Sequence, residues 1–80
     1  MRIEVNLYAS LAPYLPRIEG AAGSRVREVD EGTTILGLLR LYQVPADQVK
    51  LIFLNGIHAG GDEVLRDGDR LGVFPPIAGG

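Results

Sequence analysis

A single apolar stripe with helical spacing limits most strongly how this chain can fold. The stripe follows the i, i+3, i+4, i+7 pattern of a helix that packs one face against a sheet: Ile35, Leu38, Leu39 and Tyr42. Segments typical of short strands flank it on both sides: residues 2–8 and 25–30 before it, and residues 50–54, 57–59 and 70–74 after it. Strands on both sides of one helix predict an α+β domain in which the helix covers one face of the sheet.

Alternating hydropathy assigns the faces of the first and last predicted strands. The inward positions are Ile3, Val5 and Leu7 in the first strand, and Leu71 and Val73 in the last. Tyr8 and Phe74 therefore fall on the outward faces of these two strands. Residues 50–54 are too uniformly apolar for alternation to assign their faces, so we expect a central strand there.

Glycine, proline and polar turns punctuate the rest of the chain. Residues 9–23 form a connector that we expect three apolar side chains to attach to the core: Leu11, Leu15 and Ile18. A threonine of the pair Thr33-Thr34 is the expected helix N-cap, and Gly37 within the helix predicts a close approach to a strand. Asn55-Gly56 predicts a hairpin turn, and Asp67-Gly68-Asp69 predicts a second tight turn.

The composition excludes several classes of function. The 80 residues correspond to one domain, and the absence of cysteine excludes disulfides, thiolate nucleophiles and cysteine metal sites. The net charge is −2 and the basic residues are scattered, with Arg25 and Arg27 expected on one strand face beside acidic residues, which argues against nucleic-acid binding. Residues 51–54 are the longest apolar run, too short to span a membrane, and residues 1–4 do not resemble a signal peptide. We therefore expect a cytoplasmic protein.

The chain ends on Gly79-Gly80, after a proline elbow. Pro75 and Pro76 end the last strand, because proline cannot donate to a ladder, and they begin a stiff, extended exit. We expect a domain over residues 1–76 and a flexible tail over residues 77–80. Because glycine has no Cβ, the terminal carboxylate of such a tail can enter a narrow active site in another protein. The sequence therefore predicts that the reactive group is the C-terminus itself.

The side chains offer no enzyme site of their own. His58 is the only histidine, and no cysteine or serine lies near it in the sequence, so we expect it to have a surface or packing role. Asp62-Glu63 and Asp67-x-Asp69 lack the remaining ligands of a calcium loop. Ser10 and Ser24 have no visible general base. The sequence therefore predicts a non-enzymatic protein without a metal site.

Three motifs in order give the chain a specific family resemblance: Leu54-Asn55-Gly56, then Leu65-x-Asp67-Gly68-Asp69-Arg70-Leu71, then Phe74-Pro75-Pro76-x-x-Gly79-Gly80. With the first strand ending in Tyr8-Ala9, they resemble the MoaD/ThiS family of ubiquitin-like sulfur carriers. The proline elbow is closest to the small subunit of molybdopterin synthase. The resemblance implies a ubiquitin-like β-grasp fold: a mixed sheet of four to five strands, one main helix on one face and an extended C-terminal tail. The connector departs from the family pattern, since Leu11-Ala12 stands where relatives often carry a basic residue, so a partner contact there is in doubt.

The resemblance also implies a mechanism and a set of partners. An E1-like adenylating enzyme would use ATP to adenylate the Gly80 carboxylate, with Gly79 passing behind it. A sulfur donor of the desulfurase or rhodanese type would displace AMP to leave a thiocarboxylate. The large subunit of molybdopterin synthase, or an equivalent acceptor enzyme, would then receive the sulfur. No cofactor is expected to stay bound to the chain, since ATP belongs to the activating enzyme.

We interpret the outward aromatic residues as a docking patch for these partners. Tyr8 and Phe74 come from strands that the resemblance places side by side, and His58 stands where relatives have an apolar contact residue. Exposed aromatic side chains are favoured interface anchors. The tail completes the predicted partner-binding set, with Pro75, Pro76, Ile77 and Ala78. The competing interpretation is that these aromatic residues only cover the sheet.

Three other functions stay open from sequence alone. The carrier could serve the thiolation of thiamine precursors or of transfer RNA in place of molybdopterin. It could be a ubiquitin-like modifier joined to lysines of target proteins; Lys50 is the only lysine available for self-linkage. It could also be a ubiquitin-like interaction domain whose terminus is never activated.

Overall fold

A computed structural model of the chain describes residues 1–18 and 23–76. The elements follow in this order: β1 (Arg2–Leu7), the 3-10 helix η1 (Ala9–Tyr14), β2 (Val26–Glu28), α1 (Ile35–Leu41), the 3-10 helix η2 (Ala46–Gln48), β3 (Leu51–Leu54), β4 (Ile57–Ala59) and β5 (Arg70–Phe74). Each predicted strand and the predicted helix is present, although β2 is shorter than expected.

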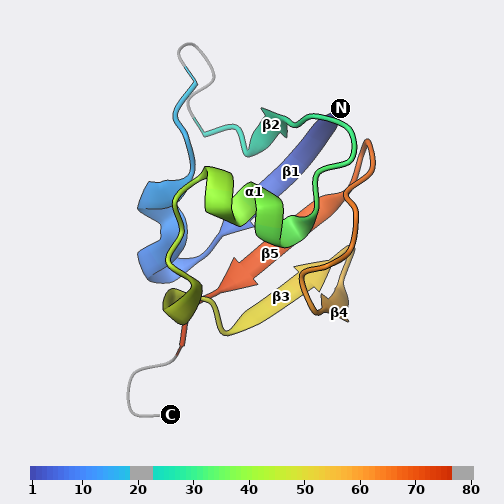
Figure 1. Ribbon diagram of the computed structural model, residues 1–80. Coiled ribbons are helices and arrows are strands. Elements are labelled where there is room, and N and C mark those ends of the chain that lie inside the picture. The colour runs from blue at the N-terminus through green and yellow to red at the C-terminus, as the bar shows by residue number, and fades with distance from the viewer. Residues whose placement is uncertain (19–22, 77–80) are drawn as a thin grey trace.

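The five strands form one mixed sheet with the order β2-β1-β5-β3-β4. β1 and β5 pair in parallel, and the other neighbouring pairs are antiparallel. The strand formed last along the sequence therefore lies in the middle of the sheet, and α1 lies across one face (Figure 1). This arrangement confirms the ubiquitin-like β-grasp fold with a five-stranded sheet.

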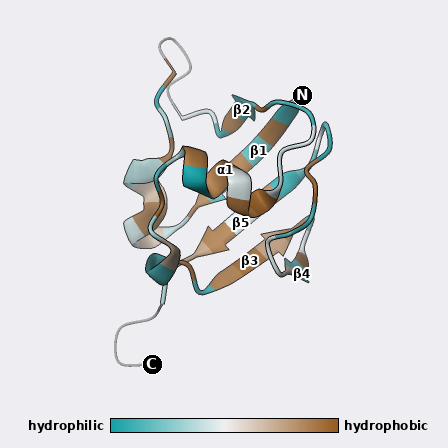
Figure 2. Ribbon diagram, in the orientation of Figure 1, coloured by the Kyte–Doolittle hydropathy of each residue, from teal (hydrophilic) through white to brown (hydrophobic). Residues whose placement is uncertain are grey.

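The hydrophobic core lies between α1 and the sheet. The predicted inward positions are all buried: Ile3, Val5, Leu7, Leu71 and Val73 from the sheet, and Ile35, Leu38 and Leu39 from the helix. Figure 2 shows hydrophobic residues along β3 and β5 and on α1. Thr34 caps the helix, since its hydroxyl accepts a hydrogen bond from the Gly37 amide at 3.0 Å. Three residues of the stripe are therefore buried in the helix as predicted, whereas the fourth, Tyr42, is the C-cap of α1 and only partly buried against the core.

Side-chain hydrogen bonds tie two turns together at the end of the sheet away from the C-terminal exit. Asn55 and Gly56 have φ values of 54° and 81°, the left-handed conformations that a two-residue hairpin requires. The Asn55 side chain donates to Asp69 at 3.0 Å and accepts from the Arg70 amide at 2.9 Å. These bonds fix the register of the β3–β4 hairpin against the start of β5.

Arg27 corrects the expected arrangement of the second strand. Arg25 was expected on the same strand face but lies before β2 and is exposed, whereas Arg27 is 7% exposed and pairs across the ladder with the buried Ile3. Its guanidinium donates to three backbone carbonyl oxygens, each at 2.8 Å: those of Pro16, Ser24 and Val26. The connector, through Pro16, and the chain around β2, through Ser24 and Val26, thus supply the acceptors that a buried charge requires.

Two further expectations were wrong. Leu11 is buried and Leu15 packs against the core, but Ile18 is 44% exposed, so only part of the connector is attached as predicted. Gly37 does not make room for a strand. A Cβ there would lie 3.0 Å from the Thr34 hydroxyl, with no strand atom among its close neighbours, so the glycine accommodates the capping side chain.

Candidate partner-docking site

Two aromatic rings stack on the face of the sheet that α1 leaves uncovered, called the open face below. The parallel register places Leu7 opposite Val73, so the residues that follow them, Tyr8 and Phe74, emerge side by side. Their ring centroids are 4.4 Å apart with an interplanar angle of 11°. Tyr8 is 41% exposed and Phe74 is 36% exposed, so the stacked pair keeps contact area for another molecule.

Phe53 is the residue of this surface that the sequence analysis missed. It lies opposite Gly72 on β5 and opposite His58 on β4. Its ring is edge-on to Phe74 at 5.9 Å and edge-on to His58 at 5.8 Å between centroids. Phe53 therefore joins His58 to the stacked pair, and we call these four residues, Tyr8, Phe53, His58 and Phe74, the aromatic face.

A signal for Phe53 was present in the sequence. Counting back from the two-residue turn at Asn55-Gly56 pairs Leu54 with Ile57, and therefore Phe53 with His58, as the structure has them. A residue that pairs directly across a ladder lies on the same face as its partner. The apolar run alone concealed the assignment, because it offers no alternation.

Gly72 has no side chain to fill the centre of the open face. A Cβ at this position would lie 3.4 Å from the ring of Tyr8 and 3.9 Å from the ring of Phe74. A hollow of about 420 Å³ lies over β5, and the aromatic rings form one of its sides. The glycine therefore allows the rings to lie close over β5.

The other side of this hollow is polar. Glu4, Asn6 and Arg70 line it. Asn6 is only 8% exposed, and its buried amide is satisfied because it donates to the Glu4 carboxylate at 2.9 Å and to the Leu71 carbonyl at 3.3 Å. The open face thus offers stacked rings at one end and hydrogen-bonding groups of both charge signs at the other.

The C-terminal exit begins at the aromatic face. The carbonyl of Phe74 accepts a hydrogen bond from the Lys50 amide at 2.8 Å, which holds the end of β5 against the start of β3. Pro75 and Pro76 follow directly and make no strand. The remaining predicted site residues, Ile77, Ala78, Gly79 and Gly80, lie outside the described residues.

The other polar candidates are engaged in turns. Asp67 accepts from the Arg2 amide at 2.7 Å, and Asp69 accepts from the Arg66 amide at 2.8 Å. The backbone amides of Glu63 itself, Gly61 and Gly60 stabilise the Glu63 carboxylate and lower its pKa.

Within residues 1–18 and 23–76, no group of three histidine or acidic side chains is placed to hold a metal ion. No helix in the same part of the chain is both long and apolar enough to cross a membrane.

The model of the ThiS family matches residues 14–80, which is more than half of the chain. Comparison with curated protein sequences gives no significant match.

Solved structures of the same fold cover almost the whole chain. SAMP1 from Haloferax volcanii is 27% identical, with 100% of both chains covered and a TM-score of 0.65. A Pyrococcus furiosus protein described as a candidate subunit 1 of molybdopterin converting factor is 25% identical, with 95% of this chain and 98% of that one covered and a TM-score of 0.63. A Helicobacter pylori complex of subunits 1 and 2 of molybdopterin-converting factor contains a chain 18% identical, with 100% of both covered and a TM-score of 0.57, which shows the fold alone.

Proposed function

This chain belongs to the ThiS family, and from that premise we propose that it is a sulfur carrier whose Gly80 carboxylate is adenylated and converted to a thiocarboxylate. The family is one of small ubiquitin-like carriers and modifiers. The observation that carries the proposal is that the aromatic face lies where the C-terminal segment leaves the sheet. Phe74 is a member of the stacked pair and is also the last residue of β5. A partner that binds this face is therefore close to the start of the segment that ends in Gly80.

The chemistry requires little from this chain beyond its terminus. A carboxylate oxygen of Gly80 attacks the α-phosphate of ATP in the activating enzyme, and pyrophosphate leaves. Hydrosulfide then attacks the acyl carbon, AMP leaves with the bonding electron pair, and a thiocarboxylate remains; a donor that carries the sulfur as a persulfide needs a thiol reductant to supply it at this oxidation level. Catalysis belongs to the partners, and the carrier supplies the positioning that makes the reaction effectively intramolecular.

The aromatic face supplies the binding energy for that positioning. Tyrosine and phenylalanine side chains that keep exposed area are typical anchors at protein interfaces, and their stacking fixes both rings before binding, so little side-chain freedom is lost. The Glu4, Asn6 and Arg70 groups beside the rings can set the orientation of the partner. We propose that the activating enzyme and the sulfur-accepting enzyme both use this surface, one after the other.

We propose molybdopterin synthesis as the pathway and the cytoplasm as the compartment. The Phe-Pro-Pro elbow and the similarity to the Pyrococcus furiosus protein support this choice of pathway. The similarity to SAMP1, named as a small archaeal modifier protein, favours a second candidate in which the same adenylate is transferred to a lysine of a target. Both functions share the first step and differ in the acceptor.

Intact-mass measurement tests the shared step and separates the two acceptors. The full chain is incubated with ATP, sulfide and lysate of its source cells, and its mass is then measured. A gain equal to sulfur minus oxygen, absent from the variant that lacks Gly80, supports the carrier. Covalent adducts on lysines of other proteins, with no sulfur gain, support the modifier. An unchanged mass beside a demonstrably active adenylating enzyme contradicts both.

A further inference from the structure

Gly72 lies in the middle of the central strand β5, where the fold itself does not require a glycine. Its φ is not among the positive values of the turn glycines, so its backbone conformation is open to other residues. A Cβ there would make only ordinary contacts with the nearest ring atoms, at 3.4 and 3.9 Å. A glycine inside a strand weakens it, and often marks a place where a ligand or another chain approaches the backbone. The reason for this glycine therefore lies outside the fold.

Side chains surround Gly72 on four sides of the open face. Across the ladders, Asn6 of β1 lies opposite it on one side and Phe53 of β3 on the other. Along β5, the neighbouring residues that share its face are Arg70 and Phe74. All four line the hollow of about 420 Å³ over this strand. One side chain of a partner could therefore reach the Gly72 backbone without displacing any residue of this chain.

The walls of the hollow change in chemistry from one end to the other. The end toward the C-terminal exit is aromatic, with the stacked rings of Tyr8 and Phe74 and the edge-on ring of Phe53. The other end carries two opposite charges, since Glu4 lies opposite Arg70 in the parallel ladder. Within the described residues, no ion pair joins these two side chains.

This lining suits a group with an aromatic body and a neutral polar end. An aromatic body gains contact with the three rings in edge-on or offset geometry. A charged end would be attracted by one of Glu4 and Arg70 and repelled by the other. A hydroxyl can instead donate to the carboxylate and accept from the guanidinium. The side chain of tyrosine combines both parts.

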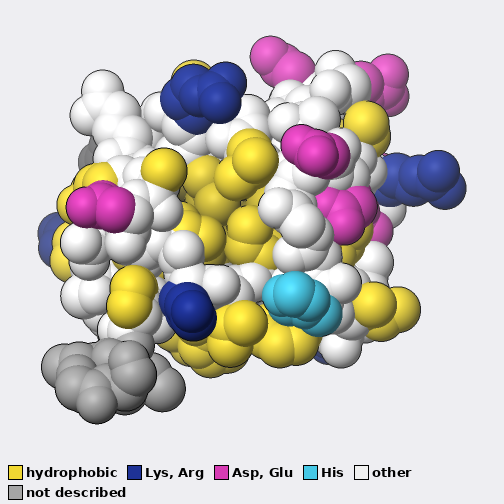
Figure 3. All heavy atoms as spheres, turned by 60° about the horizontal axis from the view of Figure 1, so that its bottom comes forward, with side chains coloured by type: hydrophobic (Ala, Val, Ile, Leu, Met, Phe, Trp, Pro, Cys, Tyr) yellow, Lys and Arg dark blue, Asp and Glu magenta, His cyan; other side chains and the backbone are white. Residues whose placement is uncertain are grey.

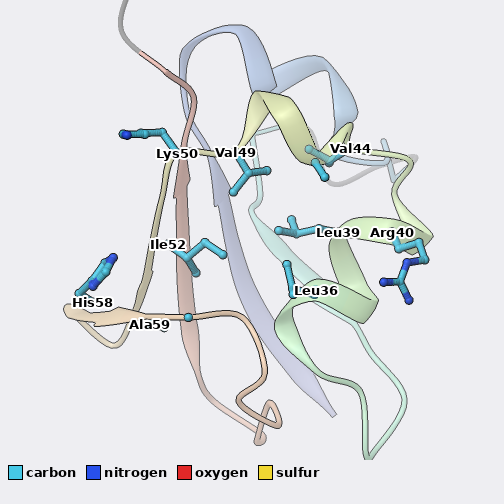
Figure 4. A pocket seen from close by; sticks show the side chains of 11 residues that line it. Leu36, Leu39, Arg40, Val44, Val49, Lys50, Ile52, His58 and Ala59 are labelled. Carbon is cyan, nitrogen blue, oxygen red and sulfur yellow. The ribbon is translucent and has the colours of Figure 1, made fainter. Parts of the chain in front are cut away.

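A larger hollow of about 650 Å³, between α1 and the strands β3 and β4, lacks such selective features. Figure 4 shows the apolar side chains of Leu39 and Ile52 on its walls, whereas the side chains of Lys50 and His58 point to the opposite side of the sheet. On the face of the molecule that Figure 3 draws, acidic and basic side chains both border the apolar ones. The lining of this larger hollow therefore favours no particular class of ligand.

We propose that the hollow over Gly72 receives one aromatic side chain of the activating enzyme, of the tyrosine type. Its ring lies beside Phe53 and Phe74, and its hydroxyl lies at the end that carries Glu4 and Arg70. Gly72 then determines specificity, because any side chain at this position would occupy the space of the inserted ring. The inference rests on the proposed function, since it names a contact that the activating enzyme makes.

Binding of p-cresol, the side-chain analogue of tyrosine, tests the hollow without any enzyme. Amide NMR of the full chain during the titration is expected to show shifts centred on Asn6, Phe53 and Gly72, with a dissociation constant in the millimolar range. Toluene, 4-methylbenzoate and 4-methylbenzylamine should bind more weakly, because they lack the hydroxyl or carry a charge. Absence of shifts around Gly72, or equal binding of a charged probe, would overturn the proposal. Because this readout needs no activation, it can fail while the carrier function stands.

Gly72→Ala gives an independent readout in which stability and binding change in opposite directions. The thermal midpoint is expected to rise by about 2–6 °C, since alanine has less freedom than glycine in the unfolded chain. The affinity for the activating enzyme should fall about tenfold, because the methyl group occupies part of the hollow. Gly60→Ala is the matched control, since Gly60 also lacks a positive φ, has open space around its Cβ position and lies outside the hollow. It should leave the affinity unchanged.

Three results would contradict this role of Gly72. An unchanged affinity of the alanine variant would mean that no side chain enters the hollow, and a lower thermal midpoint would mean that the fold itself requires the glycine. Nuclear Overhauser contacts between the rings of Tyr8 and Phe74 should persist in the variant, and their loss would attribute the weaker binding to a disturbed stack. The sulfur gain of the wild-type chain, measured with the same enzyme, separates failure of the proposed function from failure of this contact.

Discussion

The two faces of one sheet differ in what their alternate residues do. On the helix-covered face, Val5, Leu71 and Val73 are fully buried in a uniformly apolar layer. On the open face, the neighbouring positions carry two stacked rings, a glycine and a polar cluster that keep contact with solvent. One set of residues on these strands therefore stabilises the domain, and the alternate set forms the surface that we propose binds partners. Substitutions on the two faces should separate folding from recognition.

The largest effect is expected from Leu71→Ala, on the covered face. Leu71 is fully buried in the central strand, so the truncation leaves a cavity and should lower the free energy of unfolding by about 2–5 kcal/mol. Leu51→Ala is the matched control because Leu51 lies on the open face of β3 and is 40% exposed. It should cost about 1 kcal/mol, since two fifths of its surface stays in water and truncation on the open face leaves no enclosed cavity. Guanidinium unfolding followed by circular dichroism measures both, and equal costs would break the distinction between the faces.

Phe74→Ala should give the opposite pattern. Loss of a stacked interface anchor is expected to weaken binding to the cognate adenylating enzyme by about 2 kcal/mol, close to thirtyfold. The fold should remain intact, because Phe74 lies outside the core. Calorimetric titration against the purified enzyme measures the change. Leu41→Ala removes an exposed apolar side chain from the helix and should bind normally; a wild-type affinity for the Phe74 variant would remove the aromatic face from the proposed function.

Arg27→Ala tests whether a buried charged residue on the covered face stabilises the fold. Three carbonyl oxygens lose their donor, and we expect a loss of about 1–3 kcal/mol in the free energy of unfolding. Arg25→Ala, an exposed neighbour, should change stability by less than about 0.5 kcal/mol. Thermal unfolding of the two variants side by side would show the difference, and identical midpoints would mean that the buried guanidinium contributes nothing.

Thr34→Ala addresses the helix that lies on the covered face. The hydroxyl satisfies the Gly37 amide, and loss of an N-cap of this type costs about 1 kcal/mol. Thr34→Ser retains the hydroxyl and should retain most of the stability. Denaturant midpoints would resolve the two variants, and a serine variant as unstable as the alanine variant would exclude capping as the cause.

The smallest effect is expected from Glu63, whose pKa is lowered by the backbone amides of Glu63 itself, Gly61 and Gly60. A carboxylate with a folded pKa below its unfolded pKa stabilises the protein above the unfolded value, and this contribution disappears as the pH falls through the folded pKa. Glu63→Gln should therefore show a flatter decline of stability in acid than the wild-type chain. Thermal midpoints between neutral and acid pH measure it, and parallel curves would contradict the assignment.

The covered face could be predicted from the sequence much better than the open face. Alternation in β1 and β5 and the helical stripe identify buried positions directly, because burial leaves a periodic pattern. The same alternation placed Tyr8 and Phe74 at outward positions. Phe53 was missed because its own segment does not alternate, and only the register of the hairpin places it beside His58.

The remaining misses have separate causes. Arg27 is buried because the connector brings the Pro16 carbonyl to it, and no local pattern predicts that contact. Gly37 was assigned to a strand contact, although the neighbour that excludes a side chain is the Thr34 hydroxyl three residues away. Ile18 has the composition of a core residue but lies beyond the part of the connector that packs.

The central position of β5 has a consequence for synthesis on the ribosome. β1, β2, β3 and β4 leave the exit tunnel before β5, yet β1 and β3 are joined only through it. A nascent chain that lacks residues 70–74 has two separate hairpin-like pieces, no central layer and no ring to stack on Tyr8. In the proposed function, an enzyme that binds the completed aromatic face would not recognise a chain that still lacks β5, so addition of the last strand would decide when a new molecule can be activated.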